Sequence, residues 1–299
     1  MGIFEQPSTA RTVRLRDRHL VGRSPRADLV LDDRRVSGEH AVIVWQRGWW
    51  VRDLGSRNGT FVAGRRLEAG AAESLATNTE VGFGASDHHW ILTDDQPPSP
   101  WAEGPVVVHG TGEMLALPDP ERPTLTVFRD ARARWVAEDA DGLREVADGD
   151  TVEVEDAVFV LRLPEAVPGT LLGGGAALGD LVLRFVVSHD EETTRLEVRG
   201  PAGTHDLGAR SHHYLLLTLA RARLADVERA VPPETHGWLY QPELARGLGI
   251  DRALVNLHVY RARQQLLDLG VVDAAGLVER RPATEQLRLG TDRVEVNRG

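Results

Sequence analysis

The sequence predicts a multidomain protein in which two all-β parts precede an α+β part. Two breaks divide the 299 residues: a proline run at 96–100, and a Pro-Gly-Thr and Gly-Gly-Gly stretch within 168–175. Prolines lack an N–H donor and fix φ, so the first break suits neither a helix nor a central strand. The glycines of the second break are typical of a flexible linker. We therefore expect domains at 1–96, 101–167 and 176–299.

Composition narrows the class of protein. The chain has no cysteine and no lysine, and its 35 basic residues are all arginines. The absence of cysteine excludes disulfides and cysteine metal sites. The use of arginine in place of lysine is typical of a GC-rich bacterial genome. No apolar run approaches the roughly 18 residues of a membrane helix, and the first residues show no secretory signal. We therefore expect a bacterial, cytoplasmic protein.

Charge is distributed unevenly between the three parts. Residues 97–178 carry 15 acidic and 6 basic side chains, whereas residues 1–96 are neutral overall and residues 179–299 have a net charge of −1. The middle part therefore holds nearly all the excess acid, and a surface for nucleic acid would have to lie outside it.

The first part is rich in predicted strands. Short apolar or alternating runs separated by turn residues are typical of a β-sandwich. The runs are Thr12–Leu15, His19–Gly22, Leu29–Leu31, Ala41–Trp45, Trp49–Val51, Thr60–Val62, Glu80–Phe83 and His89–Leu92.

Three short motifs between these runs bring together groups that suit a phosphate. They are Gly22-Arg23-Ser24, Ser37-Gly38-Glu39-His40 and Asp53-Leu54-Gly55-Ser56-Arg57-Asn58-Gly59-Thr60. A phosphate dianion prefers cations and hydrogen-bond donors held on rigid loops. An arginine after a strand offers a planar fork of donors, and a serine at a loop tip offers a hydroxyl.

In this order and in a β setting, the three motifs resemble the signature of the forkhead-associated (FHA) domain over about residues 11–95. The resemblance implies an all-β FHA sandwich that binds phosphothreonine. It also implies that Arg23 and Ser37 contact the phosphate, that Asn58 holds the peptide backbone, and that Arg57 lies beside the phosphate or the peptide.

Gly22, His40 and Gly59 are expected to support the site, with His40 buttressing the loop and Gly59 permitting a turn. The family also implies a small apolar cleft that accepts the threonine methyl group. The sequence departs from the family's pattern at Ala63-Gly64, where the family often has Asn-Gly, so no peptide preference is predicted. The alternative is a sandwich of the same fold whose site no longer binds a phosphopeptide.

The middle part is predicted to be a small acidic β domain. Several of its runs echo the rear half of an FHA domain, but it has none of the three motifs, and its acid would repel phosphate. It is either a degenerate FHA-like copy or a plain β spacer. A further hypothesis is that its charge competes with DNA for the third part. The strand-like runs are Val106–Val108, Met114–Leu117, Leu125–Phe128, Arg134–Ala137, Thr151–Val154 and Val158–Leu163.

The third part begins with strand-like runs, Leu181–Ser188 and Arg195–Val198, and then shows helical periodicity. We predict a helix from Ser211, as its cap, to about Arg229, a short helix at Gln241–Leu248 with Pro242 in its first turn, and a longer helix capped by Asp251. A hairpin of Leu277–Arg281 and Gln286–Leu289 follows. The apolar positions expected to be buried are Leu215, Leu219 and Leu224 in the first helix, and Val255, Val259, Ala262, Leu266 and Leu269 in the third.

This order of elements, and the helix at 252–268 in particular, resembles the winged-helix effector domain of OmpR-type regulators over about residues 179–296. The resemblance implies a recognition helix that reads double-stranded DNA and a wing that contacts phosphates. Against DNA binding, Gln264-Gln265 stand where the family usually has two basic residues, and Leu254 stands at a usually polar position. The alternative is a winged helix that docks on protein. The candidate DNA-binding residues are Arg252, Asn256, Tyr260, Arg261, Arg263, Gln264, Arg280 and Arg281.

Nothing in the sequence predicts an enzyme. P-loop, nucleophile-elbow and zinc-protease motifs are absent. The adjacent pairs His88-His89 and His212-His213 should point to different sides of a strand or helix, which suits one metal poorly. We expect no catalytic residue, no metal and no cofactor.

The sequence as a whole predicts a bacterial signalling regulator. The FHA domain would bind a threonine phosphorylated by a Ser/Thr kinase, in that kinase or in its substrate, and the winged helix would bind DNA to regulate transcription. The alternative is a phospho-dependent adaptor or scaffold whose winged helix docks on protein and binds no DNA. No membrane partner is expected.

Overall fold

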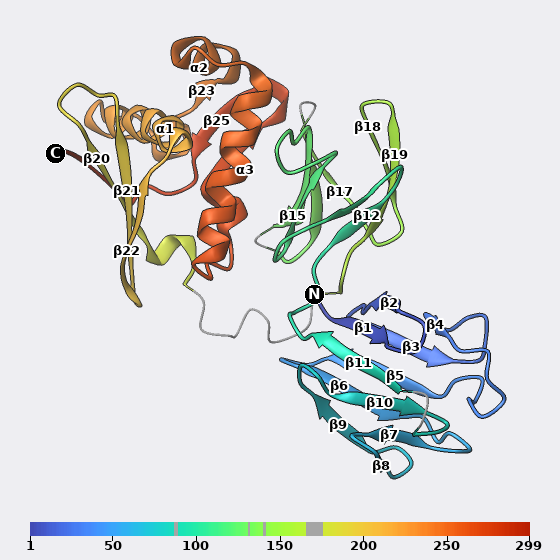
Figure 1. Ribbon diagram of the computed structural model, residues 1–299. Coiled ribbons are helices and arrows are strands. Elements are labelled where there is room, and N and C mark those ends of the chain that lie inside the picture. The colour runs from blue at the N-terminus through green and yellow to red at the C-terminus, as the bar shows by residue number, and fades with distance from the viewer. Residues whose placement is uncertain (87–88, 131, 140–141, 166–175) are drawn as a thin grey trace. The chain divides into compact units, whose positions relative to one another are not determined.

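The computed structural model describes residues 1–86, 89–130, 132–139, 142–165 and 176–299 (Figure 1). The linker predicted within 168–175 and His88 of the first histidine pair lie outside these residues. The chain divides into two compact units. The first contains Met1–Ser99 together with Pro164 and Glu165, and the second contains Pro100–Leu163 together with residues 176–299.

The first unit is a β-sandwich, as predicted. One sheet has the strand order β2-β1-β11-β10-β7-β8 and the other β4-β3-β5-β6-β9. Each of the eight predicted runs contains a strand, whereas β1, β8 and β9 were not predicted. The strands are β1 (Ile3–Gln6), β2 (Arg11–Arg14), β3 (Arg18–Gly22), β4 (Leu29–Val30), β5 (Ala41–Trp45), β6 (Trp49–Asp53), β7 (Thr60–Val62), β8 (Arg65–Arg66), β9 (Ala72–Leu75), β10 (Glu80–Phe83) and β11 (His89–Asp94).

Large apolar side chains fill the space between these two sheets. Phe4, Trp49 and Trp90 are fully buried there or nearly so, and the core also takes Ile43 and Val51 from β5 and β6. Side chains alternate along β6, so Trp49, Val51 and Asp53 all point inward. Asp53 is the polar member of this inward row, and it lies where β6 enters the third sequence motif.

The first half of the second unit contains two four-stranded antiparallel sheets, with the orders β13-β12-β19-β18 and β14-β15-β16-β17. All six predicted runs contain strands, and β12 and β17 were missed. That this part is a degenerate FHA-like copy stays a prediction. The strands are β12 (Trp101–Glu103), β13 (Val107–His109), β14 (Met114–Leu117), β15 (Leu125–Arg129), β16 (Trp135–Glu138), β17 (Leu143–Glu145), β18 (Thr151–Val154) and β19 (Ala157–Arg162).

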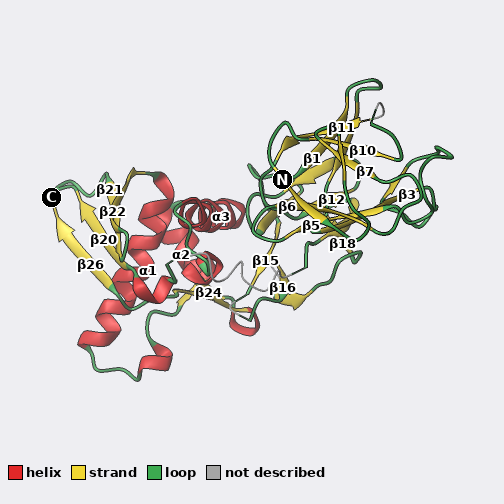
Figure 2. Cartoon of the chain, turned by 90° about the horizontal axis from the view of Figure 1, so that it is seen from below, coloured by secondary structure: helices red, strands yellow, loops and turns green. Residues whose placement is uncertain are grey.

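The second half of this unit contains every α-helix among the described residues (Figure 2). A four-stranded sheet β22-β21-β20-β26 comes with three helices and a small sheet β23-β25-β24. The elements are η2 (Leu178–Asp180), β20 (Val182–Val187), β21 (Thr194–Gly200), β22 (Gly203–Ala209), α1 (Ser211–Glu228), η3 (Pro233–Thr235), β23 (Leu239–Tyr240), α2 (Gln241–Leu248), α3 (Arg252–Asp268), η4 (Ala274–Leu277), β24 (Val278–Arg281), η5 (Pro282–Thr284), β25 (Gln286–Leu289) and β26 (Val294–Arg298).

The three helices lie where the sequence predicts them. Asp251 caps α3, because its carboxylate accepts a hydrogen bond from the Leu254 N–H at 2.7 Å. Two details of α1 were wrong. Arg210, not Ser211, is its N-cap residue and makes no side-chain capping bond, and Leu224 is only half buried. Strands β22, β23 and β26 were missed.

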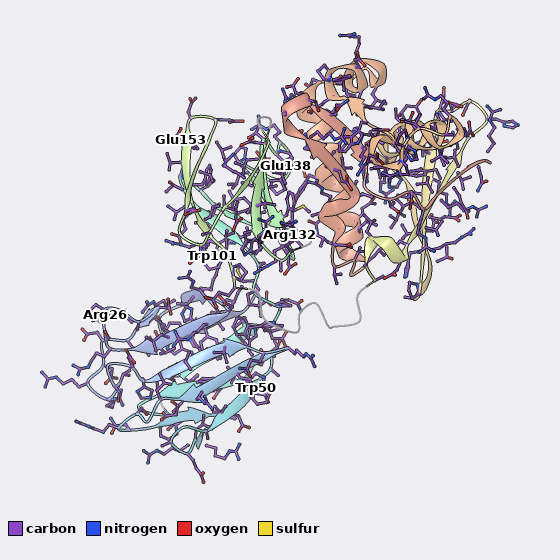
Figure 3. The ribbon with its side chains drawn as sticks, turned by 180° about the vertical axis from the view of Figure 1, so that it is seen from behind. Arg26, Trp50, Trp101, Arg132, Glu138 and Glu153 are labelled. Atoms are coloured by element: carbon purple, nitrogen blue, oxygen red, sulfur yellow. The ribbon has the colours of Figure 1, made fainter. Side chains whose placement is uncertain are left out.

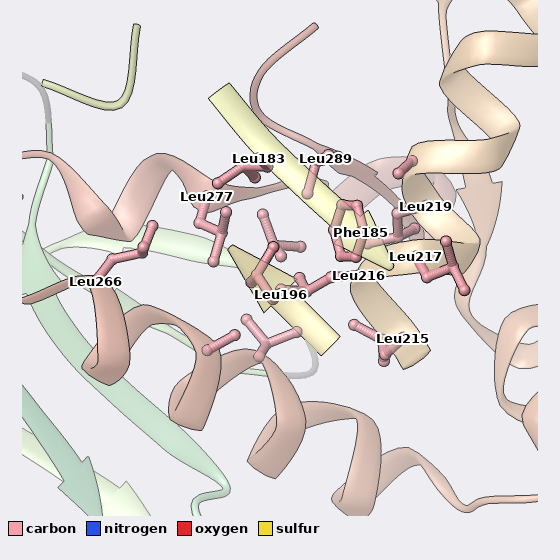
Figure 4. Close-up of a cluster of buried hydrophobic side chains, with 14 of the residues drawn as sticks. Leu183, Phe185, Leu196, Leu215, Leu216, Leu217, Leu219, Leu266, Leu277 and Leu289 are labelled. Carbon is pink, nitrogen blue, oxygen red and sulfur yellow. The ribbon is translucent and has the colours of Figure 1, made fainter. Parts of the chain in front are cut away.

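An aliphatic core joins this sheet to its helices (Figure 4). Leu183 and Phe185 of β20 meet Leu216 and Leu219 of α1, and Leu266 approaches from α3. The predicted stripe of α3 is buried at Val255, Val259, Ala262 and Leu266, whereas Leu269 is half buried at the helix end. None of the described helices is both long and apolar enough to cross a bilayer.

Candidate functional site

Three loops of the first unit, each carrying one of the sequence motifs, are tied together by hydrogen bonds. The N–H groups of Arg23 and Ser24 donate to the carbonyl oxygens of Ser37 and Gly38, both at 2.9 Å. The Arg57 N–H donates to the Ser37 hydroxyl oxygen at 3.1 Å. Motifs that are far apart in sequence are therefore held side by side in the structure.

Two glycines allow this close approach. A Cβ atom at Gly22 would lie 2.1 Å from the carbonyl oxygen of Gly38, so only glycine lets β3 and the second loop pack this closely. Gly59 has a φ of +89°, in the region that favours glycine, and a Cβ there would lie 2.3 Å from Nε of Arg66. Both glycines thus have the structural surroundings expected of supports.

His40 lies behind the second loop and is fully buried. The Ser37 N–H donates to its Nδ1 at 3.0 Å, so Nε2 carries the proton and donates to the Gly59 carbonyl at 3.1 Å. Burial lowers the pKa of His40 below its ordinary value, against the opposing effect of the Gly59 carbonyl. The neutral ring therefore bridges the second and third loops.

Asp53 is a buried carboxylate that sequence reasoning did not assign to the site. Its Oδ1 accepts from the N–H groups of Gly55 and Ser56, both at 2.8 Å, and its Oδ2 accepts from the hydroxyls of Ser56 at 2.6 Å and Thr60 at 2.7 Å. Burial alone would raise the pKa of Asp53, but these hydrogen bonds lower it below its ordinary value. The carboxylate fixes the shape of residues 54–59. The available signal was an aspartate placed two residues before a glycine and three before a serine, the pattern of an Asx-turn.

The groups left facing solvent are those that an anion needs. Arg23 and Arg57 are exposed, and neither guanidinium bonds to a described residue. The half-buried Ser37 hydroxyl accepts from a backbone N–H, so its own proton is free to be donated. The arrangement offers two cations and a hydroxyl donor on a fixed backbone.

Asn58 makes a hydrogen bond within the protein that the resemblance did not imply. Its Nδ2 donates to the carbonyl oxygen of Arg35 at 2.7 Å and so ties the second loop to the third. Its Oδ1 makes no hydrogen bond within the described part of the chain and stays available to accept a donor from a peptide backbone.

The eight DNA-binding candidates occupy very different surroundings. Arg252 and Arg281 are exposed, and Asn256, Arg261 and Gln264 are half buried. Tyr260 is buried, and the side chains of Arg263 and Arg280 are 2% and 8% exposed. The expectation that all eight lie on an open helix face or wing was therefore wrong for these three.

The partners of these candidates are side chains of the same unit. Arg252 pairs with Glu285 at 3.1 Å, and Gln264 donates to Asp268 at 3.0 Å. Arg281 lies 4.0 Å from the centre of the Trp238 ring, a cation–π contact. Arg261 pairs with Glu121, and Arg263 and Arg280 pair with Glu138. Both glutamates belong to the first half of the second unit.

The adjacent histidines of α1 converge, contrary to the expectation that they diverge. The Nε2 atoms of His212 and His213 lie 2.7 and 2.9 Å from the same oxygen, Oε1 of Gln265. Adjacent residues differ by only about 100° around a helix, and two long rings can close that angle on one acceptor. Burial lowers the pKa of both rings, to about 4 for His212, so they pack as neutral groups.

Comparison with known proteins finds a family match for the part of the chain that contains the first site. The model of the FHA domain matches residues 19–84, which contain all three motifs. A curated relative, the Arabidopsis thaliana homologue of protein phosphatase 1 regulatory inhibitor subunit PPP1R8, is 39% identical over 80 residues. That match covers 26% of this chain and only 22% of the length of the relative.

Solved structures resemble the same part of the chain. They include Mycobacterium tuberculosis EmbR in complex with a low-affinity phosphopeptide, at 26% identity over 32% of this chain and 25% of that one, with a TM-score of 0.29. They also include the N-terminal FHA domain of S. cerevisiae Rad53p in complex with a phosphothreonine peptide, at 21% identity over 30% of this chain and 89% of that one, with a TM-score of 0.27. Residues 19–84 of this chain are an FHA domain.

Proposed function

We propose that the FHA domain binds phosphothreonine in a partner protein, a Ser/Thr kinase or its substrate, and that the chain is a cytoplasmic signalling regulator rather than an enzyme. The observation that carries the proposal is the pair of exposed, unengaged guanidinium groups of Arg23 and Arg57 on loops whose backbones are fixed. The match of residues 19–84 to the FHA model supports it.

Four side chains contact the phosphopeptide in this proposal. Arg23 forks onto two phosphate oxygens, the Ser37 hydroxyl donates to a third, and Arg57 adds a cation at the rim. Asn58 receives a peptide N–H on its free Oδ1, because its Nδ2 is already bonded to Arg35.

The test is peptide binding by the full chain and by Arg23→Ala, measured by fluorescence polarisation. The probe is a degenerate peptide pool carrying phosphothreonine, with phosphoserine and unphosphorylated pools beside it. Losing a charge-assisted pair of hydrogen bonds should weaken binding by roughly 10- to 100-fold. Arg26→Ala is the matched control, because Arg26 is exposed on the same loop (Figure 3) and carries the same charge. Equal affinity of Arg23→Ala and the unaltered chain, or equal losses in both variants, would contradict the pocket.

We further infer that residues 179–296 are an OmpR-type winged helix that binds double-stranded DNA and regulates transcription. The order of a sheet, three helices and the β24–β25 hairpin supports this, as do the exposed Arg252 on α3 and Arg281 in the hairpin. Binding of duplex DNA by the full chain across a salt series is the test, since each phosphate contact steepens the salt dependence.

The second candidate function is a phospho-dependent adaptor that uses the same half of the chain to dock on protein. The burial of Tyr260, Arg263 and Arg280 favours it, because a helix face already covered by protein is not open to a DNA groove. Absence of any duplex binding at low salt, with phosphopeptide binding intact, would select the adaptor.

A further inference from the structure

In the sheet β14-β15-β16-β17, the strands β14, β15 and β16 are buried on both faces, whereas the edge strand β17 is exposed. Leu115, Val127 and Ala137 point into the core of their own half. The alternate residues, among them Phe128 and Val136, form a second cluster with residues of α3. Antiparallel sheets commonly leave one face in water, so this second burial identifies a docking surface.

The docked face of α3 is the one opposite its own core. At 100° per residue, Leu257 lies roughly 160° around the helix from both Val255 and Val259, and Tyr260 lies roughly 140° from Val255 and 100° from Val259. Leu257 and Tyr260 are 9% and 8% exposed, and they contact the β14–β16 cluster of Met114, Ala116, Phe128 and Val136. The helix is therefore held between two cores.

A buried ionic group lies at the same contact between the β14–β17 sheet and α3. Glu138 lies at the end of β16 (labelled in Figure 3) and is 5% exposed. Its Oε2 accepts a hydrogen bond from Nη1 of Arg263 at 2.6 Å. Nε of Arg280 lies 3.0 Å from Oε1 of the same carboxylate. The Arg263 guanidinium also donates to the Val278 carbonyl at 2.7 Å and lies 4.7 Å from the centre of the Phe128 ring.

These charged side chains leave no room for a ligand between them. The space remaining between Glu138, Tyr260, Arg263 and Arg280 is only about 10 Å³. Burial would raise the pKa of Glu138, but the two arginines lower it below its ordinary value, so the carboxylate stays charged. At the edge, Arg261 bonds to Glu121 at 2.5 Å in an exposed pair, which contributes little to the docking.

We propose that the β14–β17 sheet is an intramolecular competitor of nucleic acid for α3, so that DNA binding requires this sheet to leave the helix. The inference rests on the DNA binding proposed above. A recognition helix must enter a groove about 12 Å wide with one face open. Here that face is covered, and the cations that would contact phosphates are already paired, Arg261 with Glu121, and Arg263 and Arg280 with the shared carboxylate of Glu138.

The competition sets the apparent affinity. If the sheet is released in only a fraction of molecules, the apparent dissociation constant for DNA rises by the inverse of that fraction, so release in about 1% of molecules weakens binding about 100-fold. A variant that undocks the sheet therefore gains affinity without any new contact to DNA.

Two variants of the full chain undock the sheet by different means. Val136→Asp places a charge in the apolar cluster, and Val158→Asp is its matched control on the exposed surface of β19, where Val158 is 53% exposed. Glu138→Arg puts a third cation beside Arg263 and Arg280, and Glu153→Arg is its control at an exposed position of β18 (Figure 3). Each pair carries the same change in net charge.

Binding is measured with a random-sequence 40-base-pair duplex pool across a salt series, and hydrogen exchange at β14–β16 and α3 reports undocking. We expect both undocked variants to bind at least about tenfold more tightly than their controls, with a steeper salt slope. The gain in Val136→Asp is the decisive one, because an added acid by itself weakens binding to DNA.

The other outcomes separate this inference from the proposed function. Equal binding by undocked variants and controls overturns the competition but leaves DNA binding in place. No binding by any variant at low salt overturns both. Unchanged hydrogen exchange in both variants shows that these contacts do not hold the sheet on α3, which also overturns the proposal.

Discussion

Replacing Asp53 with alanine should loosen the third loop of the FHA site at its base. The carboxylate is 2% exposed and accepts hydrogen bonds from the N–H groups of Gly55 and Ser56 and from the hydroxyls of Ser56 and Thr60. Each hydrogen bond to a charged group contributes about 1.5–3 kcal/mol. The donors of Gly55 and Ser56 lie near the surface and can turn to water, whereas the fully buried Thr60 hydroxyl cannot.

From these contacts, Asp53→Ala should lower the free energy of unfolding of the first unit by about 3–5 kcal/mol, close to the cost of breaking a buried charged network. Hydrogen exchange of peptides from β5, β6 and β7 in the full chain measures this loss separately from the second unit. Asp32→Ala removes an exposed carboxylate from the same unit and is the control. A loss below about 1 kcal/mol would refute the reasoning, since it would mean that water replaces the carboxylate without strain.

Two further predictions concern the same unit. Gly22→Ala should weaken phosphopeptide binding and lower the Tm of the unit, because its Cβ would lie 2.1 Å from the Gly38 carbonyl oxygen; Gly48→Ala, with no atom within 4 Å of its Cβ, should do neither. Burial lowers the pKa of His19 to about 4 and that of His40 below its ordinary value of 6.5. The unfolded chain therefore binds more protons, so stability is complete above about pH 6.5 and is lost as the pH falls toward the folded values, by up to roughly 1.4 kcal/mol per pH unit for each ring. Denaturant unfolding at pH 7, 6 and 5 measures this, and a flat profile would contradict it.

The phosphate-site motifs could be placed from the sequence because each one is local. Gly22-Arg23 follows a strand, and the serine and asparagine motifs occupy turns, so their neighbours along the chain fix their setting. What the sequence did not show is which groups bond across loops. The bond from Asn58 to Arg35 joins residues 23 positions apart, and no periodicity predicts such a partner.

The covered face of α3 was missed for a related reason. Helical periodicity identified the stripe that faces the nearest core, and the arginines elsewhere on the helix were interpreted as solvent-exposed. One of them, Arg263, is paired with Glu138, which comes from a strand 125 residues earlier. A signal was present, because Met114–Leu117 is apolar at four consecutive positions, which is typical of a strand buried on both faces rather than one.

The bond between Asn58 and the Arg35 carbonyl has a thermodynamic consequence for any ligand of the FHA site. Loops that must order on binding lose conformational entropy, and this loss is subtracted from the affinity. Here the loops are already fixed by Asn58, His40 and Asp53 in the free protein. Only the exposed side chains of Arg23 and Arg57 lose rotamer freedom, roughly 0.5–1.5 kcal/mol each. The site is therefore preorganised, so that the entropy still lost on binding comes mainly from the peptide and from the association itself rather than from the loops of the protein.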